Sequence, residues 1–71
     1  MESKISYEPL FETMKEQGIS TYKLFKSGIN SATYYRIKEG KHVNLDTILR
    51  LCIIMDCKIE DIIEVVTDAD R

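Results

Sequence analysis

Several residue types that define other protein classes are scarce in this chain of 71 residues. It has no tryptophan, one proline, one histidine and two cysteines. Its longest apolar run, Leu51–Met55, has five residues, whereas a membrane-spanning helix needs about 20. A disulfide scaffold or a four-ligand zinc site needs more cysteine or histidine than the chain holds. The sequence therefore predicts no membrane span, no metal site and no cofactor.

The two cysteines, Cys52 and Cys57, are separated by four residues, and His42 is the only histidine. A CxxxxC pair alone is weak evidence for a metal or redox site, so we interpret both cysteines as small core residues in a reducing compartment. The N-terminal residues are not a basic stretch followed by an apolar one, so no secretory signal is expected. A cytoplasmic location is predicted.

The short length also limits the possible functions. A chain of this size is expected to form one domain, residues 1–71, and to bury only about 60% of the surface that it exposes when unfolded. No Ser-His-Asp grouping and no glycine-rich phosphate loop is present, and the hydroxyl residues occupy positions typical of helix caps. We expect a binding module without enzymatic activity or a small-molecule substrate.

Positive charge is concentrated in the middle of the chain, although the net charge is −2. Residues 20–42 carry five lysines and arginines against one glutamate, whereas residues 1–19 carry two cations against four acids. Residues 43–71 carry three cations against seven acids. This asymmetry is typical of a domain that meets phosphates with one face. An ordinary solvated face is the alternative.

Apolar residues recur at helical spacing, which predicts five short helices. The helices are expected to begin near Ser6, Ser20 or Thr21, Asn30, Asn44 and Ile59. Three glycines, Gly18, Gly28 and Gly40, are expected to end or separate them. A strand pair between residues 5–7 and 64–66 is the minor alternative, and residues 67–71 are expected to fray.

The second and third predicted helices, over about residues 20–39, have the layout of a helix-turn-helix. The second is expected to bury Leu24 with Tyr22 or Phe25. The third, residues 30–39, has only Tyr34 and Ile37 as internal apolar anchors, with Tyr34 expected to be core or half-buried. Most of its surface is therefore free for a partner. We predict that it is a recognition helix that enters the major groove of double-stranded DNA.

Two stretches carry a resemblance to a known family. The first is ISTYKL followed, after three residues, by GINSATYYRIKEG, residues 19–40; the second is LDTILRLC with MDCKIEDIIE, within residues 45–64. Together with residues 5–10 they resemble short, single-domain bacterial members of the Cro/cI-type, phage-repressor-like helix-turn-helix family. The resemblance covers residues 5–66. It implies an all-α, five-helix, lambda-repressor-like domain and a sequence-specific transcriptional regulator of the repressor type.

The resemblance also implies roles for individual residues. Those expected to read base edges are Ser31, Ala32 and Arg36, with Tyr35 beside them. Arg36 is the strongest candidate, because a guanidinium can bind guanine O6 and N7 together. Those expected to contact phosphates are Thr21, Thr33 and Lys41. The charge count adds Lys23, Lys26 and Lys38 to the phosphate-contacting set.

Three features depart from the family pattern. The connection from Leu24 to Gly28 is one residue shorter than usual, so the turn must be tighter. Lys38 stands where many members have a glutamate paired with a first-helix arginine, and that partner position is Met14 here. Lys58 replaces a common helix-capping aspartate. The first departure concerns docking on DNA, and the other two concern stability.

Self-association is expected through the fourth or fifth helix. The fourth is predicted to face the core with Leu45, Ile48, Leu49, Cys52 and Met55. Leu51, Ile53 and Ile54 then lie partly outside that stripe. One or two of them could pack against the first and fifth helices; otherwise they form an exposed patch that predicts a homodimer surface. The alternative function is a helix-turn-helix scaffold that acts as a protein-interaction or antitoxin-like module without binding DNA, which the acidic net charge favours.

Overall fold

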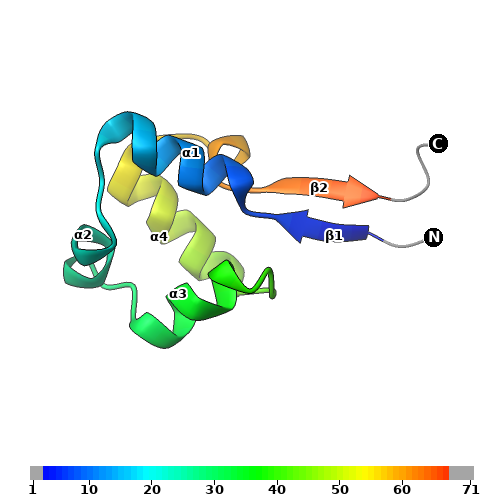
Figure 1. Cartoon of the computed structure of the whole chain (residues 1–71), viewed down its shortest axis with the longest axis horizontal. Helices are drawn as coiled ribbons and strands as arrows, with labels where there is room; N and C mark the ends of the chain where they lie inside the picture. The colour runs from blue at the N-terminus through cyan, green and yellow to red at the C-terminus, as the bar shows by residue number, and fades with distance from the viewer. Residues whose placement is uncertain (1–2, 68–71) are drawn as a thin grey trace.

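Four α-helices and a two-stranded antiparallel ribbon make up the computed structural model, which describes residues 3–67. The ribbon extends from one end of the helical body (Figure 1). In chain order the elements are β1 (Ser3–Ser6), α1 (Glu8–Gln17), α2 (Thr21–Lys26), α3 (Ser31–Lys38), α4 (Leu45–Met55), the 3₁₀ turn η1 (Ile59–Asp61) and β2 (Glu64–Thr67).

Three helices begin at the caps that the sequence predicts. The side-chain oxygens of Ser20, Asn30 and Asn44 each accept a hydrogen bond from the backbone N–H three residues later, at 3.2, 2.8 and 2.9 Å. Each bond satisfies one of the free donors of a first helical turn. The prediction for the first helix is wrong by one residue, because Ser6 ends β1 and Tyr7 is the N-cap of α1.

The predicted fifth helix is wrong, and with it the all-α assignment. Residues Ile59–Asp61 form a single 3₁₀ turn, after which Glu64–Thr67 pairs with Ser3–Ser6. The physical reason is the composition after Asp61: isoleucine, valine and threonine are stiff at Cβ and favour extended backbone when a partner strand is present. The minor alternative is thus what forms. Thr67 lies in β2, and the rest of the predicted frayed tail, 68–71, lies outside the described residues.

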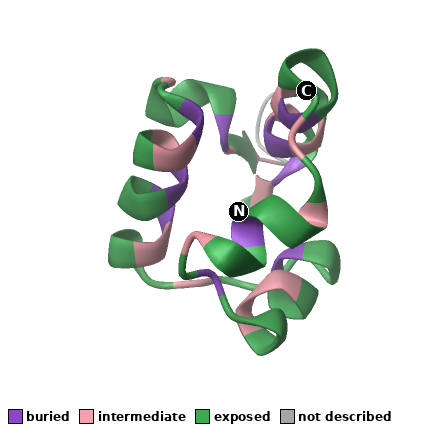
Figure 2. Cartoon of the chain, turned by 90° about the vertical axis from the view of Figure 1, so that its left-hand side faces the viewer, coloured by how far each residue is buried: buried purple, intermediate pink, exposed green. Residues whose placement is uncertain are grey.

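The core lies between the helices, whose outer faces are exposed (Figure 2). It consists of Tyr7, Leu10, Met14, Leu24, Ile29, Ile37, Ile48, Leu51, Met55 and Ile62. Cys52 and Cys57 are half-buried and pack against this core rather than within it, so their interpretation as core residues holds only in part. The predicted stripe of α4 is wrong in part, because Leu51 is fully buried while Leu45 and Leu49 are exposed. Within residues 3–67, no helix combines the length and the apolar character that crossing a bilayer requires.

Candidate nucleic-acid interface

Gly28 makes the tight turn between α2 and α3. Its backbone φ is +110°, which residues with a side chain rarely adopt, and an added Cβ would lie 3.0 Å from Arg50 Nη1. The N–H of Ile29 bonds to the carbonyl of Leu24 at 3.1 Å, which closes the turn. The short connection noted in the sequence is therefore accommodated by a glycine and by ending α2 after six residues.

The ring of Tyr34 fixes how α3 packs on α2. It lies edge-on to Phe25, with ring centroids 5.8 Å apart, and its hydroxyl accepts a hydrogen bond from Thr21 Oγ1 at 3.4 Å. Tyr34 is half-buried, as predicted. The expectation that Tyr22 or Phe25 would be buried with Leu24 is wrong, because both rings are exposed. The helix-turn-helix thus presents aromatic side chains at its surface.

The first half of α3 presents its predicted base-reading residues to solvent. Ser31 and Ala32 occupy the first turn and are exposed, and the Tyr35 side chain is 61% exposed. Residues three and four apart share a helix face, so Tyr35 lies next to both of the others. Ile37 is the only fully buried residue of α3. This face of α3 is free for a partner.

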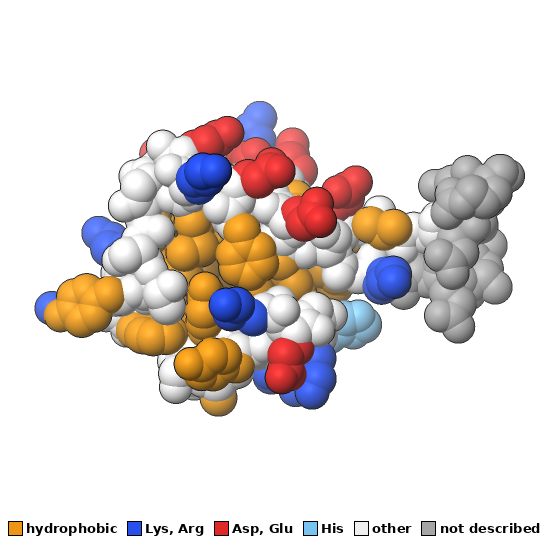
Figure 3. All heavy atoms as spheres, in the orientation of Figure 1, with side chains coloured by type: hydrophobic (Ala, Val, Ile, Leu, Met, Phe, Trp, Pro, Cys, Tyr) orange, Lys and Arg blue, Asp and Glu red, His pale blue; other side chains and the backbone are white. Residues whose placement is uncertain are grey.

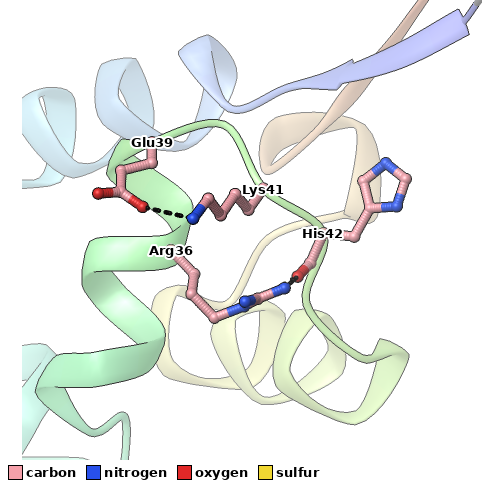
Figure 4. A network of polar contacts seen from close by, with 4 residues as sticks. All are labelled: Arg36, Glu39, Lys41 and His42. Atoms are coloured by element: carbon pink, nitrogen blue, oxygen red, sulfur yellow. Dashed lines mark hydrogen bonds and ion pairs between the residues drawn. The ribbon is translucent and has the colours of Figure 1, made fainter.

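Arg36 differs from the other three because its side chain is held by the protein itself. Its Nε and Nη2 atoms donate to the carbonyl oxygen of His42 at 3.2 and 2.6 Å, so that the guanidinium lies along the loop after α3 (Figure 4). The backbone N–H of Lys41 also bonds to the Arg36 carbonyl at 2.9 Å. A base contact by Arg36 would require the guanidinium to leave His42.

The loop between α3 and α4 is fastened from its other side by Tyr7. The Tyr7 hydroxyl donates to the carbonyl of Lys41 at 2.7 Å. Burial raises the pKa of Tyr7, and the Val43 backbone and the charge of Arg36 oppose that rise. Lys41 Nζ lies 3.2 Å from Glu39 Oε1 (Figure 4), but both side chains are well exposed, so this ion pair stabilises little. Tyr7 and Arg36 are the contacts that hold the loop.

The predicted phosphate-contacting residues lie on both helices and on the loop. Thr21 and Thr33 are half-buried, whereas the four lysines, Lys23, Lys26, Lys38 and Lys41, are exposed. Lys26 Nζ lies 5.6 Å from the centre of the Tyr22 ring. Within residues 3–67, Lys23 and Lys38 form no ion pair. Their charges are available to an anionic partner.

Acidic side chains lie mostly elsewhere. Figure 3 shows most of those on the visible face gathered over α1, where a few cationic side chains also lie, while several lysines and arginines surround α2 and α3. Sequence reasoning missed Arg50, which reaches from α4 to the Gly28 turn and adds a further cation to this region. The local signal in the sequence is its i,i+4 spacing to Asp46, and in the structure Arg50 Nη2 lies 4.0 Å from Asp46 Oδ2.

Comparisons with known proteins agree with this arrangement. The Cro/C1-type HTH DNA-binding domain family matches residues 10–68. The crystal structure of the transcriptional regulator VanUg superposes with a TM-score of 0.86, covering 96% of this chain and 92% of that one, at 20% sequence identity. At that identity the likeness shows the fold alone. No curated protein sequence matches the chain.

Proposed function

The chain belongs to the Cro/C1-type helix-turn-helix DNA-binding domain family, and we propose that it is a non-enzymatic transcriptional regulator, of the repressor type and acting in the cytoplasm. It binds a specific duplex sequence with α3 in the major groove. The observation that carries this proposal is the exposed first half of α3, where Ser31, Ala32 and Tyr35 share one face. Bases are commonly read from this end of a recognition helix.

Each exposed residue suits a different base edge. The Ser31 hydroxyl can donate or accept, and the Ala32 methyl can contact a thymine methyl group. Tyr35 offers an apolar ring and a hydroxyl on the same face. Arg36 can read guanine if the bidentate base contact replaces the two bonds to His42. These assignments are the proposed source of sequence preference.

Cations around this face supply the attraction to the duplex. Lys23 and Lys26 extend from α2, Lys38 from the end of α3 and Lys41 from the loop, with Thr21 and Thr33 as neutral phosphate contacts. The logarithm of the association constant should fall with the logarithm of salt concentration by about 0.9 per phosphate neutralised. The acidic residues on α1 then keep the duplex on one side of the domain.

We also propose a homodimer through α4, at a stripe different from the one that the sequence predicts. Leu45, Leu49 and Ile53 recur every four residues and are 63%, 49% and 79% exposed. In an antiparallel two-fold pair centred on Leu49, Leu45 of one copy lies opposite Ile53 of the other. Asp46 and Arg50 flank the stripe on one side, so each Asp46 comes close to the Arg50 of the second copy. Two copies would present α3 to two half-sites.

The second candidate function is a protein-interaction module that does not bind DNA. The observations that favour it are the net charge of −2 and the exposed apolar stripe of α4. Under this alternative, α4 binds a different protein, and the surface of α3 carries no function. Selection on DNA separates the two functions.

The experiment is selection of bound duplexes from a random pool at low salt. We expect one enriched sequence with the wild-type chain. Ala32→Glu places a negative charge on the exposed face of α3, and binding to the enriched duplex should weaken by about 100-fold or more. The control is Lys15→Glu at an exposed position of α1; its charge change of −2 exceeds the −1 of Ala32→Glu, and the variant should still keep the enrichment. No enrichment at low salt, or equal binding by Ala32→Glu, contradicts the proposal.

A further inference from the structure

The C-terminal end of α4 brings the side chains of residues 52 and 57 together. Asp56 has a left-handed backbone conformation, with φ of 51°. The N–H of Cys57 bonds to the Cys52 carbonyl at 3.0 Å, and the N–H of Asp56 bonds to the Ile53 carbonyl at 3.3 Å. These are the two bonds of a Schellman cap, in which the side chains at the first and last positions frequently contact each other.

Apolar side chains usually occupy those two positions, but here both are cysteines. Both are free thiols and both are half-buried. A disulfide needs the two Cβ atoms about 3.5–4.5 Å apart, and the bond between the Cys57 N–H and the Cys52 carbonyl keeps the two residues adjacent. Closing the bond therefore leaves the cap in place.

We propose that Cys52 and Cys57 are an oxidation site, which closes to an intramolecular disulfide when a low-molecular-weight disulfide is present. One thiolate attacks a sulfur of the small disulfide, forming a mixed disulfide and expelling one small thiolate. The second cysteine then attacks the protein sulfur of that mixed disulfide and expels the other. The two protons lost by the cysteines go to the two small thiols that are released, so the protein is oxidised by two electrons.

The surroundings of the pair set the rate of this exchange. Burial raises the pKa of the Cys57 thiol, and the nearby Cys52, Asp61 and Asp56 raise it further. At neutral pH little Cys57 is therefore ionised, and exchange through it is slow. Raising the pH increases the thiolate fraction and should accelerate closure. The disulfide therefore forms slowly at neutral pH and needs sustained oxidation.

The cross-link would fasten α4 to the segment that follows it. Residue 57 leads into η1, and the carbonyl of Asp61, the last residue of η1, accepts a hydrogen bond from Thr13 Oγ1 on α1 at 2.8 Å. Gln17 Nε2 donates to the Met55 carbonyl at 2.9 Å, so α1 contacts this same end of α4. The expected effect is a rise in the thermal midpoint of about 5 °C or more.

The test uses the full chain in buffers of oxidised and reduced glutathione at pH 8, followed by alkylation and intact mass measurement. Closure gives the mass of a single chain less two hydrogen atoms, with no alkylating reagent taken up, and the reductant restores two reactive thiols. Cys52→Ser and Cys57→Ser are near-isosteric controls and should each stop at the mixed disulfide. Two alkylatable thiols at the most oxidising ratio, or a stable mixed disulfide in the wild type, would overturn the proposal. No DNA is needed, so the result is independent of the proposed function.

Discussion

The helix-turn-helix and α4 differ in how they use apolar side chains. Helices α2 and α3 each contribute one buried residue, Leu24 and Ile37, and otherwise present polar, basic and aromatic side chains. Helix α4 buries three residues and still exposes an apolar stripe. A domain with so small a core thus has two kinds of free surface. The first suits a charged, hydrogen-bonding partner, and the second suits another apolar surface.

The largest expected effect is on the free energy of unfolding, and it distinguishes the buried face of α4 from its exposed face. Leu51→Ala removes a fully buried side chain and should lower the free energy of unfolding by about 2–5 kcal/mol. Ile53→Ala, on the exposed side, should cost less than about 0.5 kcal/mol in the monomer. Urea denaturation at low protein concentration measures both. A similar cost for the two variants would mean that the exposed stripe is covered in the isolated chain.

The next effect tests whether the exposed stripe of α4 pairs two copies. Leu49→Asp together with Ile53→Asp should give a monomer by light scattering, because four desolvated carboxylates would meet in the interface. The α3 surface is unchanged, so each monomer should still bind one half-site, with an apparent affinity roughly 100-fold lower because the second contact is no longer linked to the first. A wild-type monomer at tens of micromolar contradicts the homodimer.

Substituting Arg36 tests whether the α3 surface reads bases. If Arg36 reads a base, Arg36→Ala should relax the preference at one base-pair position, by about 1–3 kcal/mol of discrimination. If instead its bonds to His42 only hold the loop, the variant should weaken binding evenly at all positions. Base-by-base competition with mutated duplexes distinguishes these results. Arg36→Lys keeps the charge but cannot donate two hydrogen bonds in the guanidinium geometry. It should therefore restore neither the base preference nor the loop contact.

Local physical rules explain why much of the fold could be predicted. The caps Ser20, Asn30 and Asn44 bond to N–H groups three residues away, so their chemistry is visible in a short window. The ribbon pairs residues about 60 positions apart, and no local pattern near Ile59 shows that a partner strand exists. The helix predicted there does not form, because residues 64–67 pair with a strand that is distant in the sequence.

The candidate site likewise has features that follow from local sequence and features that depend on nonlocal packing. That α3 leaves its first half exposed follows from its few apolar residues, whereas the partner of Arg36 depends on the path of the next loop. In α4 nearly every residue from Ile48 to Met55 is apolar, so periodicity could not decide which face is buried. Leu45 and Leu49 were predicted in the buried stripe and Leu51 partly outside it, whereas with α1 and η1 packed against α4 Leu51 is fully buried and the other two are exposed.

The smallest expected effect concerns Tyr7, which joins the two regions by holding the loop between α3 and α4. Tyr7→Phe leaves the ring but removes the hydroxyl that bonds to the Lys41 carbonyl, and should lower the free energy of unfolding by about 1 kcal/mol. Burial raises the pKa of Tyr7, so the folded state favours the neutral hydroxyl. Its contribution is complete below the ordinary tyrosine pKa of 10.0 and is lost as the pH rises through the higher folded value. Urea denaturation at pH 8 and pH 11 should therefore show a smaller difference between the two proteins at pH 11, and an equal difference would mean that the Tyr7 hydroxyl ionises as freely in the folded chain as in the unfolded one.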